Sequence, residues 1–231
     1  MPTHPPEPRS LSDKPLNYVD PVDATADGDE RVVEDRTVEE YATSDRQRSL
    51  RARIEAQDLP VSRDREKLAG VVEHAIMAGN GITLLQGETG SGKSLYTPLI
   101  VRKLLRKLDR RLRVVVMQPR RDAASGVARA MAALADEELG GTIGFSTSEV
   151  KAVRFNSQIS VITSGIFLRH LMSGDLRASE VGAIIVDELH EGSIDYHLAL
   201  GLMRLMQQSG ELPPTVLTSA TMNRAGVQGF F

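Results

Sequence analysis

The chain has 231 residues, enough for one sizeable α/β domain with or without a tail. It is 41% hydrophobic and 26% charged, as in ordinary soluble proteins, and no apolar run approaches the length of a membrane span. The absence of cysteine excludes disulfides, thiolate catalysis and Cys-ligated zinc, and the net charge of −3 means that any nucleic-acid site must be local.

The first part of the chain is predicted to be an extension, residues 1–58, ahead of a folded domain at 59–231. Residues 1–36 are rich in proline and then in acidic residues, a composition typical of disorder. Thr37 and Glu40 have the spacing of a capping box and predict a charged helix over 37–57. Pro60 then ends this pattern.

From residue 59 onward, apolar runs rich in β-branched residues alternate with helical patterns, which predicts a parallel sheet with helices on both faces. The expected strands are 82–85, 114–117, 142–146, 159–163, 183–186 and 215–217, and those at 82–85, 114–117 and 183–186 are expected to be buried. The expected helices are 62–79, 95–108, 122–136 with Asp122 as its cap, 164–172, 194–206 with Leu198, Leu202, Leu205 and Met206 facing inward, and a last one capped by Asn223.

The stretch between the first expected strand and the helix after it fits the pattern G-x-x-x-x-G-K-[ST] of nucleotide-binding phosphate loops. Its members are Gly87, Glu88, Thr89, Gly90, Ser91, Gly92, Lys93 and Ser94. Glycines let backbone N–H groups surround a polyphosphate, and the N-terminus of the following helix attracts anions. Lys93 is predicted to reach the β- and γ-phosphates, and the Ser94 hydroxyl to bind Mg²⁺.

A second candidate site follows the apolar strand at 183–186, where Asp187 and Glu188 come directly after the strand. Parallel strands place such residues at the carboxyl edge of the sheet, beside the phosphate loop. Asp187, Glu188 and Ser94 are predicted to lie at the Mg²⁺ ion, with Asp187 holding it. Glu188 is also predicted to orient or deprotonate the attacking water. The predicted catalytic set is therefore Glu188, Lys93 and Asp187.

Five short motifs occur in order: GETGSGKS at 87–94, QPRR at 118–121, TSG at 163–165, DELH at 187–190 and SAT at 219–221. Together they resemble motifs I, Ia, Ib, II and III of the DEAH-box helicases of superfamily 2. DELH departs from DEAH only at Leu189. The resemblance implies the first RecA-like domain of an ATP-dependent RNA helicase, covering residues 59–231. It also implies ATP or another NTP, with Mg²⁺, as cofactors.

The resemblance implies further roles. Arg120 and Arg121 would contact a nucleic-acid backbone, with a solvated basic turn as the alternative. Thr163 and Ser164 would lie on the same side, with a helix cap as an equal alternative. His190, Ser219 and Thr221 would couple the nucleotide state to strand movement. The expected partner is single-stranded RNA, with DNA as the alternative, in the cytoplasm, or in the nucleus of a eukaryote.

Two departures from the family bear on function. The arginine that stacks on adenine in family members falls at Ala130, beside Arg129, so base selectivity is expected to be loose. In family members a second RecA-like domain supplies arginine fingers, and here such fingers would have to come from a further domain or a partner. We therefore expect this polypeptide alone to bind ATP–Mg²⁺ and hydrolyse it slowly. The alternatives are a non-catalytic module that binds ATP or RNA, a fragment of a viral superfamily 2 helicase, and an unrelated phosphate-loop enzyme such as a kinase.

Overall fold

A computed structural model describes residues 44–57, 65–77, 81–108, 112–152, 157–176, 179–190, 193–221 and 224–231. The chain divides into two units, residues 1–32 and 33–231, and every described residue belongs to the second unit. The predicted disorder of residues 1–36, the capping box at Thr37 and the cap at Asn223 therefore lie outside the described residues. The expected division at residue 59 stays a prediction.

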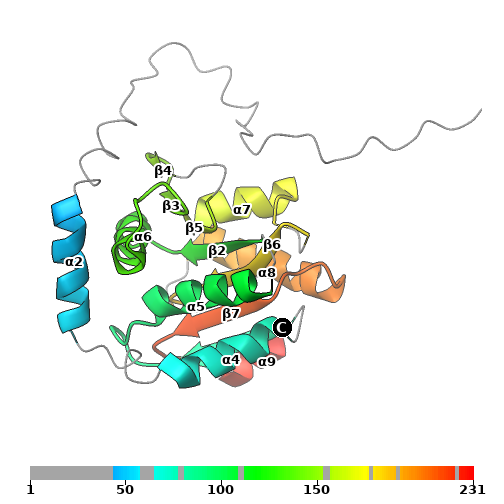
Figure 1. The fold of residues 1–231 in the computed structure, drawn as a ribbon. Helices are drawn as coiled ribbons and strands as arrows, with labels where there is room; N and C mark the ends of the chain where they lie inside the picture. Colours follow the sequence, from blue (N-terminus) through cyan, green and yellow to red (C-terminus); the bar gives the residue numbers. More distant parts are fainter. Residues whose placement is uncertain are drawn as a thin grey trace, which may run out of the picture. The chain divides into compact units, whose positions relative to one another are not determined.

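The described part of the chain forms a seven-stranded sheet in the order β1-β7-β6-β2-β5-β3-β4 (Figure 1). The strands are β1 (Ile82–Gln86), β2 (Arg113–Gln118), β3 (Ile143–Ser146), β4 (Lys151–Ala152), β5 (Ile159–Thr163), β6 (Val181–Val186) and β7 (Thr215–Ser219). All neighbours are parallel except β3 and β4, which are antiparallel. The six predicted strands are confirmed, whereas β4, only two residues long, carries no sequence pattern and was not predicted.

Helices cover both faces of this sheet, as predicted. They are α2 (Ser44–Ala56), α4 (Arg65–Met77), α5 (Lys93–Lys107), α6 (Arg121–Ala135), α7 (Ser164–Ser173), α8 (Ile194–Gln208) and α9 (Arg224–Phe230). Buried side chains of α4, α5 and α6 pack in one hydrophobic cluster, and those of α7 and α8 pack in the other. None of the described helices has the length and hydropathy needed to cross a membrane.

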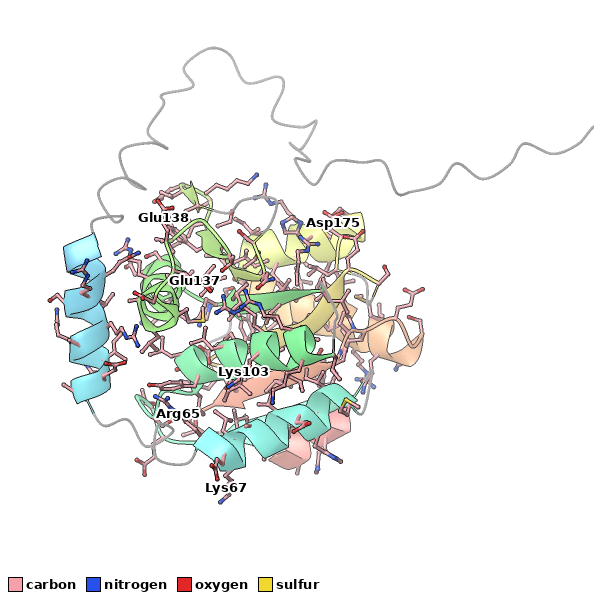
Figure 2. The ribbon with its side chains drawn as sticks, in the orientation of Figure 1. Arg65, Lys67, Lys103, Glu137, Glu138 and Asp175 are labelled. Carbon is pink, nitrogen blue, oxygen red and sulfur yellow. The ribbon has the colours of Figure 1, made fainter. Side chains whose placement is uncertain are left out.

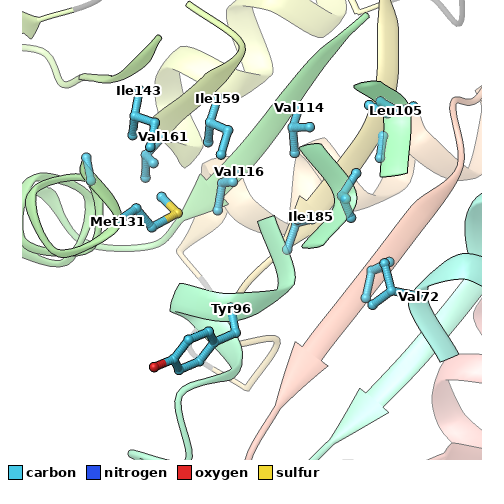
Figure 3. Packing of buried hydrophobic residues seen from close by; sticks show 14 of the residues in the cluster. Val72, Tyr96, Leu105, Val114, Val116, Met131, Ile143, Ile159, Val161 and Ile185 are labelled. Carbon is cyan, nitrogen blue, oxygen red and sulfur yellow. The ribbon is translucent and has the colours of Figure 1, made fainter. Parts of the chain in front are cut away.

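Strand β2 shows why the centre of a strand that is buried on both faces is apolar. Val114 and Val116 point into the cluster beneath α4, α5 and α6, where they lie among Tyr96, Met131 and Ile185 (Figure 3). Val115 and Met117 point into the cluster beneath α7 and α8. Successive residues of a strand face opposite sides of the sheet, so a strand covered on both faces needs apolar residues throughout.

The structure corrects the expected inward face of α8. Leu198 and Leu205 are 54% and 60% exposed, and the buried positions are Tyr196, Ala199 and Met203. Leu202 and Met206 are partly buried, packed against the core as predicted. Helix α8 is apolar nearly all around, so its sequence offers two stripes of suitable spacing, and packing on α7 and the sheet selects between them.

Two smaller expectations also differ from the structure. Strand β1 is only partly buried, because it lies at an edge of the sheet. Asp122 lies in the first turn of α6, and the N-cap residue is Arg120. The helix expected over 37–57 is confirmed from Ser44 to Ala56, where it packs on α6 with Ile54 buried, and residues 37–43 lie outside the described residues.

Candidate nucleotide-binding site

The candidate site lies where the carboxyl ends of β1, β7, β6 and β2 meet, and backbone hydrogen bonds join the segments that leave these strands. The Gly87 N–H donates to the Ser219 carbonyl at 3.2 Å, which ties the start of the phosphate loop to the end of β7. The Asp187 N–H donates to the Met117 carbonyl at 3.0 Å, and the Leu189 N–H donates to the Thr218 carbonyl at 3.0 Å. The two stretches predicted from sequence therefore leave the same edge of one sheet.

The phosphate loop turns from β1 into α5 through two glycines in the left-handed region, Gly90 with φ of 76° and Gly92 with φ of 94°. A side chain at either position would be strained, so the glycines of the motif are needed for this path. Gly92 is the N-cap residue of α5, and its carbonyl accepts from the Tyr96 N–H at 3.0 Å. The loop thus ends at the N-terminus of a fifteen-residue helix, which favours an anion there.

The ammonium group of Lys93 is turned back onto the loop. Its Nζ donates to the carbonyl oxygens of Gly87 and Glu88, both at 2.6 Å, and to the Ser91 hydroxyl at 2.9 Å. Burial lowers the pKa of Lys93 from its usual value, and the negative charges of Glu188 and Asp187 oppose this shift. Lys93 therefore interacts electrostatically with both acids, although its hydrogen-bond partners come from the loop itself.

Asp187 is held on both oxygens of its carboxylate. The Gln118 amide nitrogen donates to Oδ2 at 2.6 Å, and the Thr218 hydroxyl donates to Oδ1. The Tyr196 hydroxyl donates to the backbone carbonyl of Asp187 at 3.0 Å, and the residue is only 2% exposed. A carboxylate fixed in this way at a strand end presents hard oxygen ligands in one orientation, which suits Mg²⁺.

Sequence reasoning gave no role to Gln118, Thr218 or Tyr196, although they fix the orientation of Asp187. A signal was present for Gln118, because it is a buried polar residue that directly follows the apolar run 114–117 at the end of β2. Thr218 carried no such signal, because Thr215 and Ser219 of the same strand are polar as well. No group of three or more His, Asp and Glu side chains suited to a metal occurs among the described residues. A cation at Asp187 would therefore take most of its ligands from phosphate oxygens, water and the Ser94 hydroxyl, as Mg²⁺ commonly does.

Glu188, His190 and Ser219 form a connected group beside Asp187. Glu188 has a φ of 52°, in the left-handed region that is strained for a residue with a side chain. His190 Nδ1 lies 3.3 Å from Glu188 Oε2 and 3.0 Å from the Ser219 hydroxyl. The Ser219 hydroxyl in turn donates to the Thr221 carbonyl at 2.6 Å. The structure thus brings the three predicted coupling residues together with Glu188.

The four candidate nucleic-acid residues lie at the starts of two helices that follow β2 and β5. Arg120 is the exposed N-cap residue of α6, and Arg121 forms an ion pair with Glu149. Thr163 is the N-cap residue of α7 but makes no capping hydrogen bond through its side chain, and Ser164 Oγ lies 3.3 Å from the hydroxyl of Ser193. Both pairs follow the carboxyl ends of neighbouring strands, and their contact with nucleic acid remains a prediction.

Comparison with known protein families gives a match over residues 70–229, to the family described as DEAD/DEAH box helicase. The match spans the phosphate loop, Asp187 and Glu188 and the end of β7. Two crystal structures of Escherichia coli HrpB, described as a DEAH/RHA helicase and a DExH-box NTPase, share the fold with a TM-score of 0.60. They are 31% and 32% identical to this chain, and the alignments cover 74% of it and 21% and 20% of those chains.

Curated relatives give the same picture. The ATP-dependent RNA helicase HrpB of Escherichia coli is 37% identical over 125 residues, 54% of this chain and 15% of its own length. The probable ATP-dependent RNA helicase DHR2 of Saccharomyces cerevisiae is 32% identical over 176 residues, 75% of this chain and 23% of its own. The ATP-dependent RNA helicase TDRD9 of mouse is 29% identical over 167 residues, 72% of this chain and 12% of its own. The chain therefore spans less than a quarter of each of these relatives.

Proposed function

The chain belongs to the DEAD/DEAH box helicase family, and from this premise we propose that it is the ATP-binding motor domain of an ATP-dependent RNA helicase of the DEAH type. The proposal of RNA as the substrate is supported by the names of the relatives HrpB, DHR2 and TDRD9. The observation that carries the ATPase proposal is the Asp187 carboxylate, fixed by Gln118 and Thr218 beside the loop that holds Lys93.

Binding of ATP would begin at the loop of residues 87–94. The backbone N–H groups of this loop and the N-terminus of α5 would surround the phosphates. Lys93 would exchange its present acceptors, the Gly87 and Glu88 carbonyls and the Ser91 hydroxyl, for β- and γ-phosphate oxygens. Because these acceptors are uncharged, a phosphate competes well for the ammonium group.

Hydrolysis would use the two acids in different roles. Ser94 and Asp187, with Glu188 close by, would hold Mg²⁺, which when bound neutralises charge on the β- and γ-phosphate oxygens. Glu188 would accept a proton from water as the water oxygen attacks the γ-phosphorus. The bond between that phosphorus and the β–γ bridging oxygen breaks, and ADP and inorganic phosphate leave.

Coupling to RNA would pass through the neighbouring strand ends. Arg120, Arg121, Thr163 and Ser164 would contact the phosphate backbone. Contacts run from Glu188 through His190 to Ser219 and so connect the water-activating acid to the end of β7. This connection supports a coupling role for His190, Ser219 and Thr221. Movement of the segment after β7 would then change the position of the Glu188 carboxylate.

Robust turnover would require groups from a second RecA-like domain or a partner, which would supply arginine fingers. Such fingers contribute about 10³–10⁵ in rate in related phosphoryl-transfer enzymes. The proposal is supported by the length of the relatives, of which this chain spans 12% to 23%. We therefore expect the 231-residue polypeptide to bind ATP with Mg²⁺ and to hydrolyse it slowly.

The proposal is tested with a fluorescent ATP analogue and with single-turnover hydrolysis of ATP at excess protein. Glu188→Gln should bind nucleotide with an affinity like that of the wild type and hydrolyse it at least ~10²-fold more slowly, because it lacks the proton acceptor. Glu211→Gln, an exposed acid ahead of β7, is the matched control and should leave both quantities unchanged. Equal rates for Glu188→Gln and the wild type would contradict the catalytic role and favour a non-catalytic module.

A further inference from the structure

The chain is acidic overall, but one segment is strongly basic. Residues 102–113 contain seven of the 28 lysines and arginines and only one of the 31 acidic residues. This segment therefore has a net charge of +6, against −9 for the remainder of the chain. A basic segment of this kind is a sequence pattern typical of polyanion binding, which the net charge of the whole chain conceals.

Four of these cations line a groove between the end of α5 and the end of α6. The groove has a volume of ≈500 Å³ and is lined by Arg102, Lys103, Arg106 and Lys107, with Leu99 and Ala135 as its apolar part. The five lining residues of α5 have the spacing i, i+3, i+4, i+7 and i+8, so they share one face of the helix. Figure 2 shows Lys103 on α5, with Glu137 near the end of α6.

The two arginines of the groove are fixed by uncharged and acidic neighbours. Arg102 Nη1 donates to Glu137 Oε2 at 2.7 Å and to the Thr142 hydroxyl at 3.1 Å. Arg106 Nε donates to the Gln158 side-chain oxygen at 2.9 Å. The two lysines, Lys103 and Lys107, are exposed and have no hydrogen bond or ion pair to any residue that the structure describes.

The groove lies beside the amino ends of the sheet strands, whereas the nucleotide site lies at their carboxyl ends. Thr142 and Gln158, the partners of Arg102 and Arg106, immediately precede β3 and β5, whereas the phosphate loop follows the carboxyl end of β1. Lys103 and Lys107 are ten and fourteen residues beyond Lys93 on the same helix, so they lie about 15 and 21 Å along its axis from the start. A ligand in the groove would therefore bind without touching the nucleotide.

We propose that this groove, defined by Leu99, Arg102, Lys103, Arg106, Lys107 and Ala135, binds the phosphate backbone of single-stranded RNA. The proposal rests on the proposed function for its choice of ligand. It adds an RNA contact beside the amino ends of the strands, whereas Arg120, Arg121, Thr163 and Ser164 lie at the carboxyl ends.

The disposition of the cations favours a phosphate backbone over an acidic peptide. Both guanidinium groups, which suit bidentate recognition of carboxylates, already donate to Glu137 and Gln158. The groups that remain are two ammonium ions on flexible stems, one helical turn or about 6 Å apart. Such point charges neutralise successive phosphates without requiring one geometry, and Leu99 and Ala135 offer apolar surface to the sugars.

The test measures the binding of a fluorescent 20-nucleotide oligouridylate to the full chain, by anisotropy, as a function of salt. Each phosphate contact contributes about 0.7 to the slope of log K against log salt for single strands. Lys103→Gln should therefore reduce the slope by about 0.7, and Lys103→Gln/Lys107→Gln by about 1.4, with an affinity loss on the order of 10-fold at 0.1 M salt. Replacement of both lysines by arginine should restore the slope.

Lys67→Gln on α4 makes the same chemical change at another exposed lysine and should leave the slope unchanged. In a second measurement, RNA should protect Lys103 and Lys107, but not Lys67, from acetylation, as followed by mass spectrometry. An unchanged slope for the double variant, or no protection of either lysine, would overturn the proposal. Protection by poly-glutamate but not by RNA would also overturn it and assign the groove to an acidic protein.

Binding of the fluorescent ATP analogue is measured in the same variants, and we expect it to be unchanged. This separates the two proposals. A wild-type chain that binds RNA through the lysines but fails to bind nucleotide would contradict the proposed function and leave the groove standing. A chain that binds nucleotide, with RNA affinity that depends on Arg121 but not on Lys103 and Lys107, would contradict only the groove.

Discussion

The Gln118 amide nitrogen, at the end of β2, donates a hydrogen bond of 2.6 Å to the Asp187 carboxylate at the end of the neighbouring strand β6. A second donor, the Thr218 hydroxyl at the end of β7, reaches the other carboxylate oxygen. Asp187 is therefore oriented by the strands on both sides of its own. Groups that orient a metal ligand in this way commonly contribute 10- to 100-fold to metal affinity or activity.

Thr218→Val removes one of these donors while keeping the shape of the side chain. We expect the variant to fold and to need about 10- to 100-fold more Mg²⁺ for binding of a fluorescent ATP analogue, because Asp187 loses its fixed orientation. Thr215→Val is the matched control, since Thr215 is a buried residue of the same strand whose hydroxyl donates to the Pro213 carbonyl. Equal Mg²⁺ requirements for the two variants would refute the orienting role of Thr218.

Lys93→Met gives a prediction for stability at alkaline pH. Burial lowers the pKa of Lys93 below its usual value of 10.5, so the folded chain releases this proton at a lower pH than the unfolded chain does. Between those two pKa values the unfolded state binds more protons, and the free energy of unfolding rises with pH. The wild type should therefore gain stability relative to Lys93→Met as pH increases toward 10.5, as measured by urea unfolding at a series of pH values.

The contrary result would be a difference in stability that stays constant or falls over this range. Lys67→Met, at an exposed lysine of α4, corrects for general effects of alkaline pH on the fold. The measurement needs no nucleotide, so it reports on the environment of the Lys93 ammonium group independently of the proposed function.

Glu137→Gln gives the opposite dependence, at acid pH. Burial tends to raise the pKa of Glu137, but hydrogen bonds from Arg102 and Thr142 and the charges of Arg102 and Arg106 outweigh it and hold the pKa below the usual 4.5. The carboxylate therefore stabilises the fold above about pH 4.5, and this contribution is lost as pH falls through the lower pKa of the folded state. At pH 7 we expect the substitution to cost about 1 kcal/mol in the free energy of unfolding.

Thermal unfolding between pH 7 and pH 3 checks this prediction: the gap between wild type and Glu137→Gln should be largest at pH 7 and shrink as pH falls. Glu138→Gln alters the exposed acid next in sequence and serves as the control, with little effect expected at any pH. A gap that widens on acidification would show that the Glu137 carboxylate does not stabilise the fold in its charged form.

Gly182 and Gly201 predict opposite effects of alanine. A Cβ at Gly182 in β6 would lie 2.5 Å from a methyl carbon of Leu105 and 2.9 Å from the Cβ of Leu112, so Gly182→Ala should destabilise the fold by about 1–3 kcal/mol. A Cβ at Gly201 in α8 would meet nothing within 4 Å, so Gly201→Ala should stabilise it by about 0.5–1 kcal/mol. Urea unfolding of both variants measures these differences, and equal effects would show that α5 does not lie as close to β6 as described.

The sequence determined the order of strands and helices and the members of the phosphate loop. Strands buried on both faces must be apolar throughout, and a loop that approaches phosphate needs glycine at Gly90 and Gly92, so both features leave a visible pattern. Asp187 and Glu188 were found for the same reason, since acids directly after an apolar strand are conspicuous. The two-residue strand β4 and the exposure of Leu198 and Leu205 left no such pattern.

Only the tertiary structure decided which side chains meet. The strand order β1-β7-β6-β2 brings Gln118 and Thr218 to either side of Asp187, although they lie 69 and 31 residues away in sequence. The same is true of Arg102 and Arg106, whose partners Glu137, Thr142 and Gln158 come from the segments after α6 and before β3 and β5. A linear pattern reports the periodicity of each element, whereas contacts between elements depend on sheet order and helix packing, which many sequences with the same periodicity could satisfy differently.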